Sequence, residues 1–173
     1  DSDGDGLLDE DDQCPQQFGV MLFQGCPDTD GDGIQDSKDA CPTLFGVFAA
    51  QGCPLTAHPD EEAQVLSSQL ILFGVGSTEV TNYQFLDRVV AFLRAHPEYR
   101  ATVFGHADAS PADGPPQAVS ERRARAVYGY LLQQGIPAAR LTWRGNGDNF
   151  PLGSPETMAG SRQNRRVEIR ITK

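Results

Sequence analysis

The sequence lacks several features that mark common functional classes. It contains no run of about 18 apolar residues, so no segment is predicted to cross a membrane as a helix. Its four cysteines include no CxxC pair, which argues against a zinc site. Residues 1–60 hold 13 Asp and Glu but a single Lys, whereas residues 61–173 hold 11 acidic and 13 basic residues. Without a strongly basic stretch, we expect no nucleic-acid partner.

A catalytic nucleophile is also missing. No Ser or Cys has a neighbouring base in the pattern that nucleophilic catalysis requires. His106 and Asp108 are two residues apart and could form an acid–base pair, but His106 is explained more simply as a strand residue. We therefore expect a binding protein and no enzyme.

The acidic first third is an internal repeat. The unit DSDGDGLLDEDDQCP at Asp1–Pro15 recurs as DTDGDGIQDSKDACP at Asp28–Pro42. Aspartates on alternate residues, with Gly where the chain turns sharply, are typical of a calcium loop with oxygen ligands. The predicted ligands are ten aspartates and two backbone carbonyls: Asp1, Asp3, Asp5, Leu7, Asp9 and Asp12, then Asp28, Asp30, Asp32, Ile34, Asp36 and Asp39. An acidic, solvated and disordered linker is the alternative interpretation.

The last acidic ligand of each loop is Asp, and no helical pattern flanks the loops. The units therefore resemble thrombospondin type 3 repeats more than EF-hands. Each unit also holds two Cys-Pro pairs, which predict disulfides and an oxidising, extracytoplasmic compartment. One bridge within each repeat, Cys14–Cys26 and Cys41–Cys53, is the preferred pairing, although the sequence leaves Cys26–Cys41 open.

A unit of this length has little apolar core, so calcium and disulfides are expected to supply much of its order. We expect the stiffened repeats to act as a spacer. Four aromatic side chains are expected to pack inside the repeats or, alternatively, to form an apolar face for a partner: Phe18, Phe23, Phe45 and Phe48.

The domain boundaries follow from composition. Residues 1–54 are predicted to be two repeats, 1–27 and 28–54, and residues 65–173 a globular domain. Residues 55–64 are predicted to be a linker, because Pro59 precedes an acidic cluster.

Periodicity predicts an α+β fold for the globular domain, with a mixed β-sheet packed against two main helices. The predicted helices cover residues 82–95 and 117–134, with a short turn or helix start at 161–166. The predicted strands cover residues 70–73, 99–106, 141–144 and 167–172, the last at an edge of the sheet or half-exposed.

Arg123 lies near the centre of the apolar face of the second predicted helix. A buried guanidinium requires a partner, because an unpaired buried charge is costly. Asp108 follows the preceding strand and should lie at the same edge of the sheet. The two residues could form a structural salt bridge or a ligand site.

The series GHAD, SERRARAV, GIP, RGNGD and NRRVEI resembles the OmpA-like peptidoglycan-binding domain, over about Val65–Lys173. The resemblance implies that Asp108 and Arg123 hold the ammonium and carboxylate of diaminopimelate in the peptidoglycan stem peptide. It also implies a non-catalytic anchor. Four residues depart from the family's pattern: Ala107 and Pro116, in place of Thr and Asn, and Gly74 and Gly76, in place of polar residues.

The resemblance further implies a Gram-negative envelope protein at the periplasmic face of the outer membrane, with a membrane-embedded part upstream. Because the sequence begins inside a repeat, we expect it to be a piece of a longer protein. The alternative is a calcium-dependent adhesin or matrix module whose OmpA-like domain binds weakly or not at all.

Overall fold

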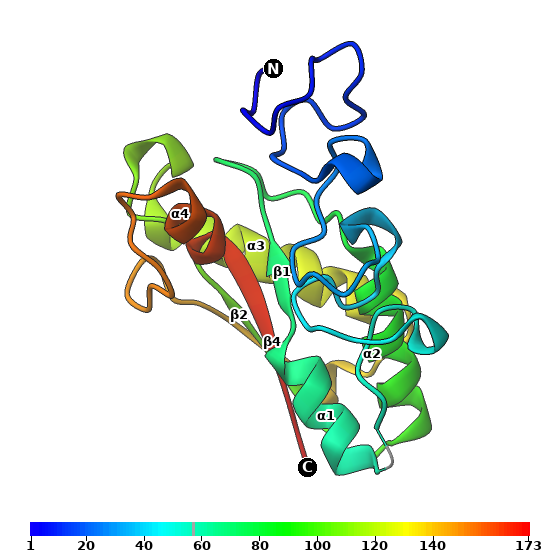
Figure 1. The fold of residues 1–173 in the computed structure, drawn as a ribbon. Coiled ribbons are helices and arrows are strands. Elements are labelled where there is room, and N and C mark those ends of the chain that lie inside the picture. The colour runs from blue at the N-terminus through cyan, green and yellow to red at the C-terminus, as the bar shows by residue number, and fades with distance from the viewer. Residues whose placement is uncertain (57) are drawn as a thin grey trace. The chain divides into compact units, whose positions relative to one another are not determined.

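The chain divides into two compact units, Asp1–Thr56 and Ala57–Lys173, in a computed structural model that describes residues 1–56 and 58–173 (Figure 1). In this part of the chain, no helix combines the length and the apolar composition that a membrane crossing needs.

The first unit contains two similar repeats with little regular structure. Each repeat has a short bridge between two extended residues, Val20 with Cys26 and Val47 with Cys53. Three single turns of 3-10 helix complete its regular structure: η1 (Met21–Phe23), η2 (Asp36–Lys38) and η3 (Phe48–Ala50). Disulfides join Cys14 to Cys26 and Cys41 to Cys53, which confirms the predicted pairing.

The QGCP motif of each repeat is explained by a left-handed turn. Gly25 and Gly52 have φ angles of +82° and +84°, which favour glycine. A side chain at either position would also overlap the carboxylate of Asp12 or Asp39. These glycines therefore cover the last predicted calcium ligand of each loop.

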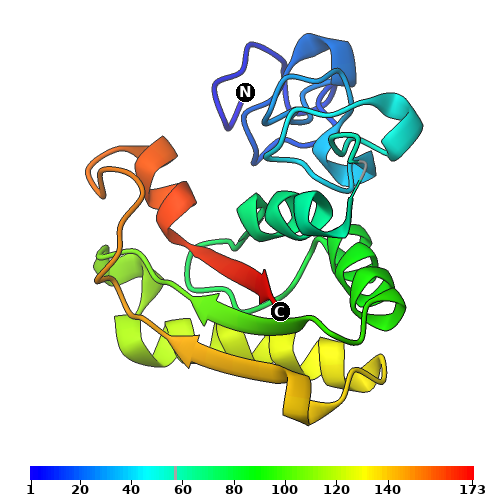
Figure 2. The same cartoon turned by 90° about the horizontal axis from the view of Figure 1, so that it is seen from below.

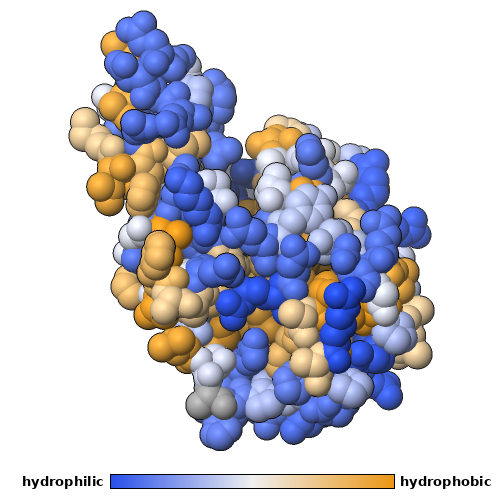
Figure 3. All heavy atoms as spheres, turned by 90° about the vertical axis from the view of Figure 1, so that its right-hand side faces the viewer, coloured by the Kyte–Doolittle hydropathy of each residue, from blue (hydrophilic) through white to orange (hydrophobic). Residues whose placement is uncertain are grey.

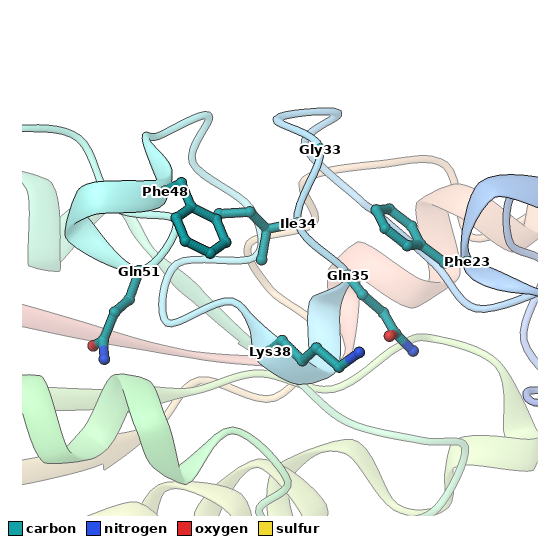
Figure 4. Close-up of a pocket in the computed structure, with 7 residues that line it drawn as sticks. All are labelled: Phe23, Gly33, Ile34, Gln35, Lys38, Phe48 and Gln51. Atoms are coloured by element: carbon teal, nitrogen blue, oxygen red, sulfur yellow. The ribbon is translucent and has the colours of Figure 1, made fainter.

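The aromatic side chains of the repeats are more exposed than predicted. Phe18, Phe45 and Phe48 are 63%, 68% and 87% exposed, so the expectation that they pack inside the repeats is wrong. A 27-residue unit stabilised by a disulfide has too few apolar neighbours to cover them. Phe23 is half-buried and lines a hollow of about 490 Å³ together with Ile34 and Phe48 (Figure 4). On this unit, hydrophobic side chains reach the surface beside a strongly hydrophilic tip (Figure 3).

The segment predicted to be a linker belongs in part to a helix. Helix α1 (Pro59–Ser68) begins at Pro59, and Asp60, Glu61 and Glu62 lie in its first turn. Proline at the first helical position and acidic residues next to the helix N-terminus both favour this start. The helix buries Ala63 and Leu66 in the core of the second unit.

The second unit is built on a four-stranded mixed sheet. Its strands are β1 (Leu70–Leu72), β2 (Arg100–Gly105), β3 (Leu141–Gly145) and β4 (Arg166–Thr172), in the order β1-β4-β2-β3. Strands β2 and β3 are parallel, and β4 is antiparallel to both β1 and β2. Strand β4 is thus an inner strand. The predicted edge position is wrong, but its alternating burial confirms a half-exposed strand.

Helices cover one face of this sheet. Besides α1, they are α2 (Tyr83–Ala95) and α3 (Pro116–Gln133), while the short α4 (Met158–Asn164) directly precedes β4 at the end of that strand (Figure 1). Alternate residues of β2 and β4, such as Val103 and Ile169, are fully buried in one core with the apolar residues of α1, α2 and α3. Figure 2 shows α3 along strands β2 and β3. The α+β fold with a mixed sheet is confirmed.

Gly105 sets the distance between β2 and α3. A Cβ at this position would overlap the carbonyl oxygen of Ser120 in α3. Glycine therefore lets the helix lie directly against the end of the strand. Arg123, one turn further along α3, is brought under the residues that follow β2.

Candidate functional site

Arg123 is the centre of a buried polar cluster at the carboxyl end of β2. Its side chain is 0% exposed, as the helical periodicity predicted. Nε donates to the Ser77 carbonyl at 2.9 Å, Nη1 to the His106 carbonyl at 3.1 Å and Nη2 to the Gly74 carbonyl at 3.2 Å. The Phe73 ring lies against the guanidinium, with Cζ 5.3 Å from its centroid.

The carboxylate that pairs with Arg123 belongs to Asp113. Nη1 donates to Asp113 Oδ2 at 2.8 Å and Nη2 to Oδ1 at 2.6 Å, a bidentate pair. With the three carbonyls, this pair uses all five N–H groups of the guanidinium. A structural salt bridge was a sound expectation for Arg123, but Asp108 as its partner is wrong. Asp113 is the only acidic residue between Asp108 and Glu121, which was the available signal.

Asp113 lies in a tight turn between β2 and α3. The single turn η4 (Pro111–Asp113) is capped by Ser110 and ends at Gly114. The Asp113 carboxylate also accepts from two backbone amides, Gly76 N and Asp108 N, both at 2.9 Å. Burial opposes its ionisation, but the hydrogen bonds from Arg123 and the two amides outweigh burial and lower its pKa.

Asp108 therefore joins the cluster through its backbone. Its side chain is 1% exposed, and Oδ1 lies 3.5 Å from Asn164 Nδ2 of α4. The structure thus brings Asp108 and Arg123 to the same place, with the Asp113 carboxylate bonded to both. Two of the departures from the family's pattern contribute backbone atoms here: the Gly74 carbonyl accepts from Arg123, and the Gly76 amide donates to Asp113.

His106 points away from this cluster. Nε2 lies 3.8 Å from Glu168 Oε2, and the imidazole meets the Phe150 ring edge-on. In the described part of the chain, neither ring nitrogen has a hydrogen-bond partner. Burial and the nearby Arg166 charge lower the pKa of His106 to about 4, although Glu168 opposes this shift. A neutral imidazole packed on the sheet fits the simpler interpretation of this residue.

The aspartates of the first unit form two clusters. Asp1, Asp3 and Asp5 present oxygens within 4.8 Å of one another, and so do Asp28, Asp30 and Asp32. Burial, together with the neighbouring charges of Asp32, Asp28 and Asp36, raises the pKa of Asp30 to about 6. Burial likewise raises the pKa of Asp39 to about 7, together with Asp30, Asp32 and Asp36.

Several of these carboxylates share one bonding pattern. One oxygen, Oδ1, accepts from a backbone amide two residues further on, at 2.7–3.2 Å. The other oxygen, Oδ2, is buried and has no hydrogen-bond partner among the described residues. The carboxylates with this pattern are those of Asp3, Asp5, Asp12, Asp30 and Asp39. Oriented, dehydrated carboxylate oxygens are what a hard cation such as calcium requires, so these residues fit the ion.

Other predicted calcium ligands accept hydrogen bonds from residues of the first unit. Asp9 accepts from the amide and hydroxyl of Ser2, and Asp36 accepts in the same way from Thr29, at 2.6–2.7 Å. These bonds close each loop. The Oδ2 atom of Asp32 accepts from Gly46 N at 3.1 Å. Leu7 and Ile34 donate amides to Asp5 and Asp32, and calcium ligation by their carbonyls stays a prediction.

Comparison with known proteins extends the resemblance found in the sequence. The chain is 35% identical over 88 residues to the peptidoglycan-binding protein ArfA of Mycobacterium bovis, which covers 51% of this chain and 27% of that protein. It is 33% identical over 177 residues to outer membrane porin F of Pseudomonas aeruginosa, which covers 99% of this chain and 41% of the porin. The chain thus spans less than half the length of these relatives.

The fold has counterparts among solved structures. The peptidoglycan-associated lipoprotein of Burkholderia pseudomallei matches with a TM-score of 0.60 and 21% identity, over 66% of this chain and 100% of that one. The model of the OmpA family matches residues 72–165, which include β2, the turn with Asp113, and α3 with Arg123. The chain therefore belongs to the OmpA family.

Proposed function

We propose that this protein is a non-catalytic anchor of the cell envelope whose second unit binds peptidoglycan non-covalently through the diaminopimelate of a stem peptide. The observation that carries the proposal is the buried cluster of Arg123 and Asp108 at the end of β2. Support also comes from the relative named as peptidoglycan-binding and from the outer-membrane porin. The porin's name favours a Gram-negative envelope, and we place the protein at the periplasmic face of the outer membrane.

The chemistry of the cluster matches a free amino-acid end. Asp108 offers a carboxylate to an ammonium group, and Arg123 offers a planar fork to a carboxylate. Low exposure strengthens both interactions, because water competes less for them. A lysine- or ornithine-type stem peptide carries the ammonium without the carboxylate, so it should bind more weakly.

Calorimetry with a stem peptide that ends in free diaminopimelate tests the proposal. Asp108→Ala should weaken binding by about 2–5 kcal/mol, because the ligand ammonium loses its buried partner. Arg123→Ala should abolish binding, but it also leaves Asp113 buried and unpaired, at a cost of about 3–5 kcal/mol in stability. Arg123→Lys keeps the charge and loses the fork, so it is the better variant for separating binding from folding.

Circular dichroism must show that each variant is folded. Exposed Asp148 provides the matched control, and Asp148→Ala should bind as the wild type does. Unchanged affinity in folded Asp108→Ala and Arg123→Lys would contradict the assigned site. Pull-down on purified sacculi separates this function from the adhesin alternative, because binding that disappears only on chelation of calcium would favour the alternative.

We also propose that the first unit binds calcium and acts as a stiffened spacer. Support comes from the buried Oδ2 atoms of Asp3 and Asp30, which recur in the same place in both repeats and have no hydrogen-bond partner in residues 1–56 and 58–173. Asp1, Asp5, Asp12, Asp28, Asp32 and Asp39 would complete the two shells, with Asp9 and Asp36 closing the loops. Calcium titration followed by circular dichroism or limited proteolysis tests the proposal, and no change on titration would contradict it.

A further inference from the structure

The Asp113 carboxylate is bound as a ligand carboxylate would be. Its two oxygens accept four hydrogen bonds, two from the Arg123 fork and one each from the amides of Gly76 and Asp108, at 2.6–2.9 Å. A guanidinium and two converging amides form a complete carboxylate subsite. The side chain that fills it is 1% exposed.

This arrangement conflicts with simple binding of an external carboxylate. All five N–H groups of Arg123 are engaged, so a stem peptide finds no free donor there. The ligand carboxylate and Asp113 must therefore compete for the same atoms. Asp108 differs, because the contact of its carboxylate with Asn164 Nδ2 is long, at 3.5 Å, so this carboxylate remains suited to an ammonium group.

The segment that carries Asp113 is a short turn that is exposed on one side. Residues 110–114 contain a single 3-10 turn, held internally by Asp113 N to Ser110 O and Gly114 N to Pro111 O. Pro111 and Ala112 are exposed, whereas Asp113 is buried. The buried Asp113 side chain thus attaches the turn to the cluster, and Gly114, with φ of +95°, supplies the left-handed conformation with which the turn ends before α3.

We propose that Asp113 is a built-in competitor that fills the carboxylate subsite in the ligand-free protein, and that a diaminopimelate end binds by displacing the turn at residues 110–114. This inference rests on the proposed function. The incoming carboxylate takes the Arg123 fork and the amides of Gly76 and Asp108, while the ammonium meets the Asp108 side chain. A ligand whose carboxylate is amidated cannot replace Asp113 and is rejected.

Competition lowers the apparent affinity by the fraction of molecules in which the subsite is open. Asp113→Ala should therefore bind the free diaminopimelate stem peptide at least about tenfold more tightly than the wild type, measured by calorimetry. Asp113→Asn has the same shape but one acceptor oxygen, so it should bind with intermediate affinity. Exposed Asp148→Ala is the matched carboxylate control and should match the wild type. Equal or weaker binding by folded Asp113→Ala would overturn the proposed competition.

A second measurement does not depend on peptidoglycan. In Asp113→Ala the subsite is vacant, so sodium acetate should raise Tm more than sodium chloride at equal ionic strength and pH 7, whereas the wild type should respond equally to both salts. Acetate stabilisation without stem-peptide binding in any variant would overturn the proposed function and support the subsite. Stem-peptide binding without acetate stabilisation would overturn the subsite.

The wild type itself supplies a third measurement, which holds even if both Asp113 variants fail to fold. Saturating stem peptide should speed hydrogen exchange at the amides of residues 112–114, because a turn no longer held by the Asp113 side chain opens its internal bonds more often. Slower or unchanged exchange in this segment would overturn displacement of the turn.

Discussion

His106 is a buried titratable residue whose neutral form the fold requires. Its ring packs between Phe150 and the β4 side chain of Glu168, close to the charge of Arg166. Burial and Arg166 lower its pKa to about 4, below the ordinary value of 6.5. Between these two pH values, His106 therefore binds a proton in the unfolded chain and stays neutral in the folded chain.

Acid should consequently destabilise the second unit. The free energy of unfolding should be constant above about pH 7 for this group and should fall as the pH drops from about 6.5 to 4, by up to about 3 kcal/mol. His106→Gln cannot titrate, so its stability should lack this loss. Urea unfolding of both proteins between pH 4 and 7.5 measures the difference. Parallel pH profiles would show that His106 is not the responsible group.

The partner of Arg123 illustrates what residue patterns can and cannot predict. The 3.6-residue period predicted that Arg123 is buried, and the cost of an unpaired charge predicted a carboxylate beside it. Both Asp108 and Asp113 are close enough to Arg123 in the sequence to supply this carboxylate. The choice between them depends on backbone amides of Gly76 and Asp108, which only the folded chain brings together.

Among the elements, α1 offers the clearest test, because part of it was predicted to be a linker. Leu66 is fully buried in the core, and Ser67 Oγ accepts from the Ile171 amide of β4 at 2.9 Å. Leu66→Ala should therefore destabilise the second unit by about 2–5 kcal/mol, because it leaves a cavity. Exposed Gln64→Ala in the same helix should change stability by less than about 0.5 kcal/mol. Chemical denaturation measures the free energy of unfolding of both variants. A small effect of Leu66→Ala would mean that α1 does not belong to the core.

Strongly periodic elements were predictable, whereas short ones depended on context. Helix α2 begins after Asn82, whose side chain accepts from Phe85 N as an N-cap, and it ends near Ala95 as predicted. Helix α1 was missed because its proline and acidic residues are equally common in linkers. The central position of β4 was also out of reach, because strand order depends on pairing across the sheet and local alternation is the same at an inner or outer position.

At the scale of the whole molecule, the two units should respond differently to calcium. Calorimetric unfolding should show a calcium-dependent transition for the repeats and a calcium-independent one for the OmpA-like unit. Asp30→Asn, which alters a dehydrated oxygen, should weaken calcium binding by at least about tenfold. Asp11→Asn, an exposed acidic residue outside the predicted ligands, is the control. Equal effects of the two variants would indicate diffuse charge screening without a defined site.

The positions of the two disulfides limit how far the chain can be drawn out. Each bridge joins residues 12 apart whose Cα atoms are 5.0 Å apart, so each shortens the fully stretched chain. At roughly 3.4 Å per extended residue, the two bridges together remove about 70 Å of length. A load that breaks all the hydrogen bonds of the first unit would still meet this covalent limit. Reduction of the cysteines should therefore increase the length to which the first unit can be stretched and leave the Arg123 cluster of the second unit intact.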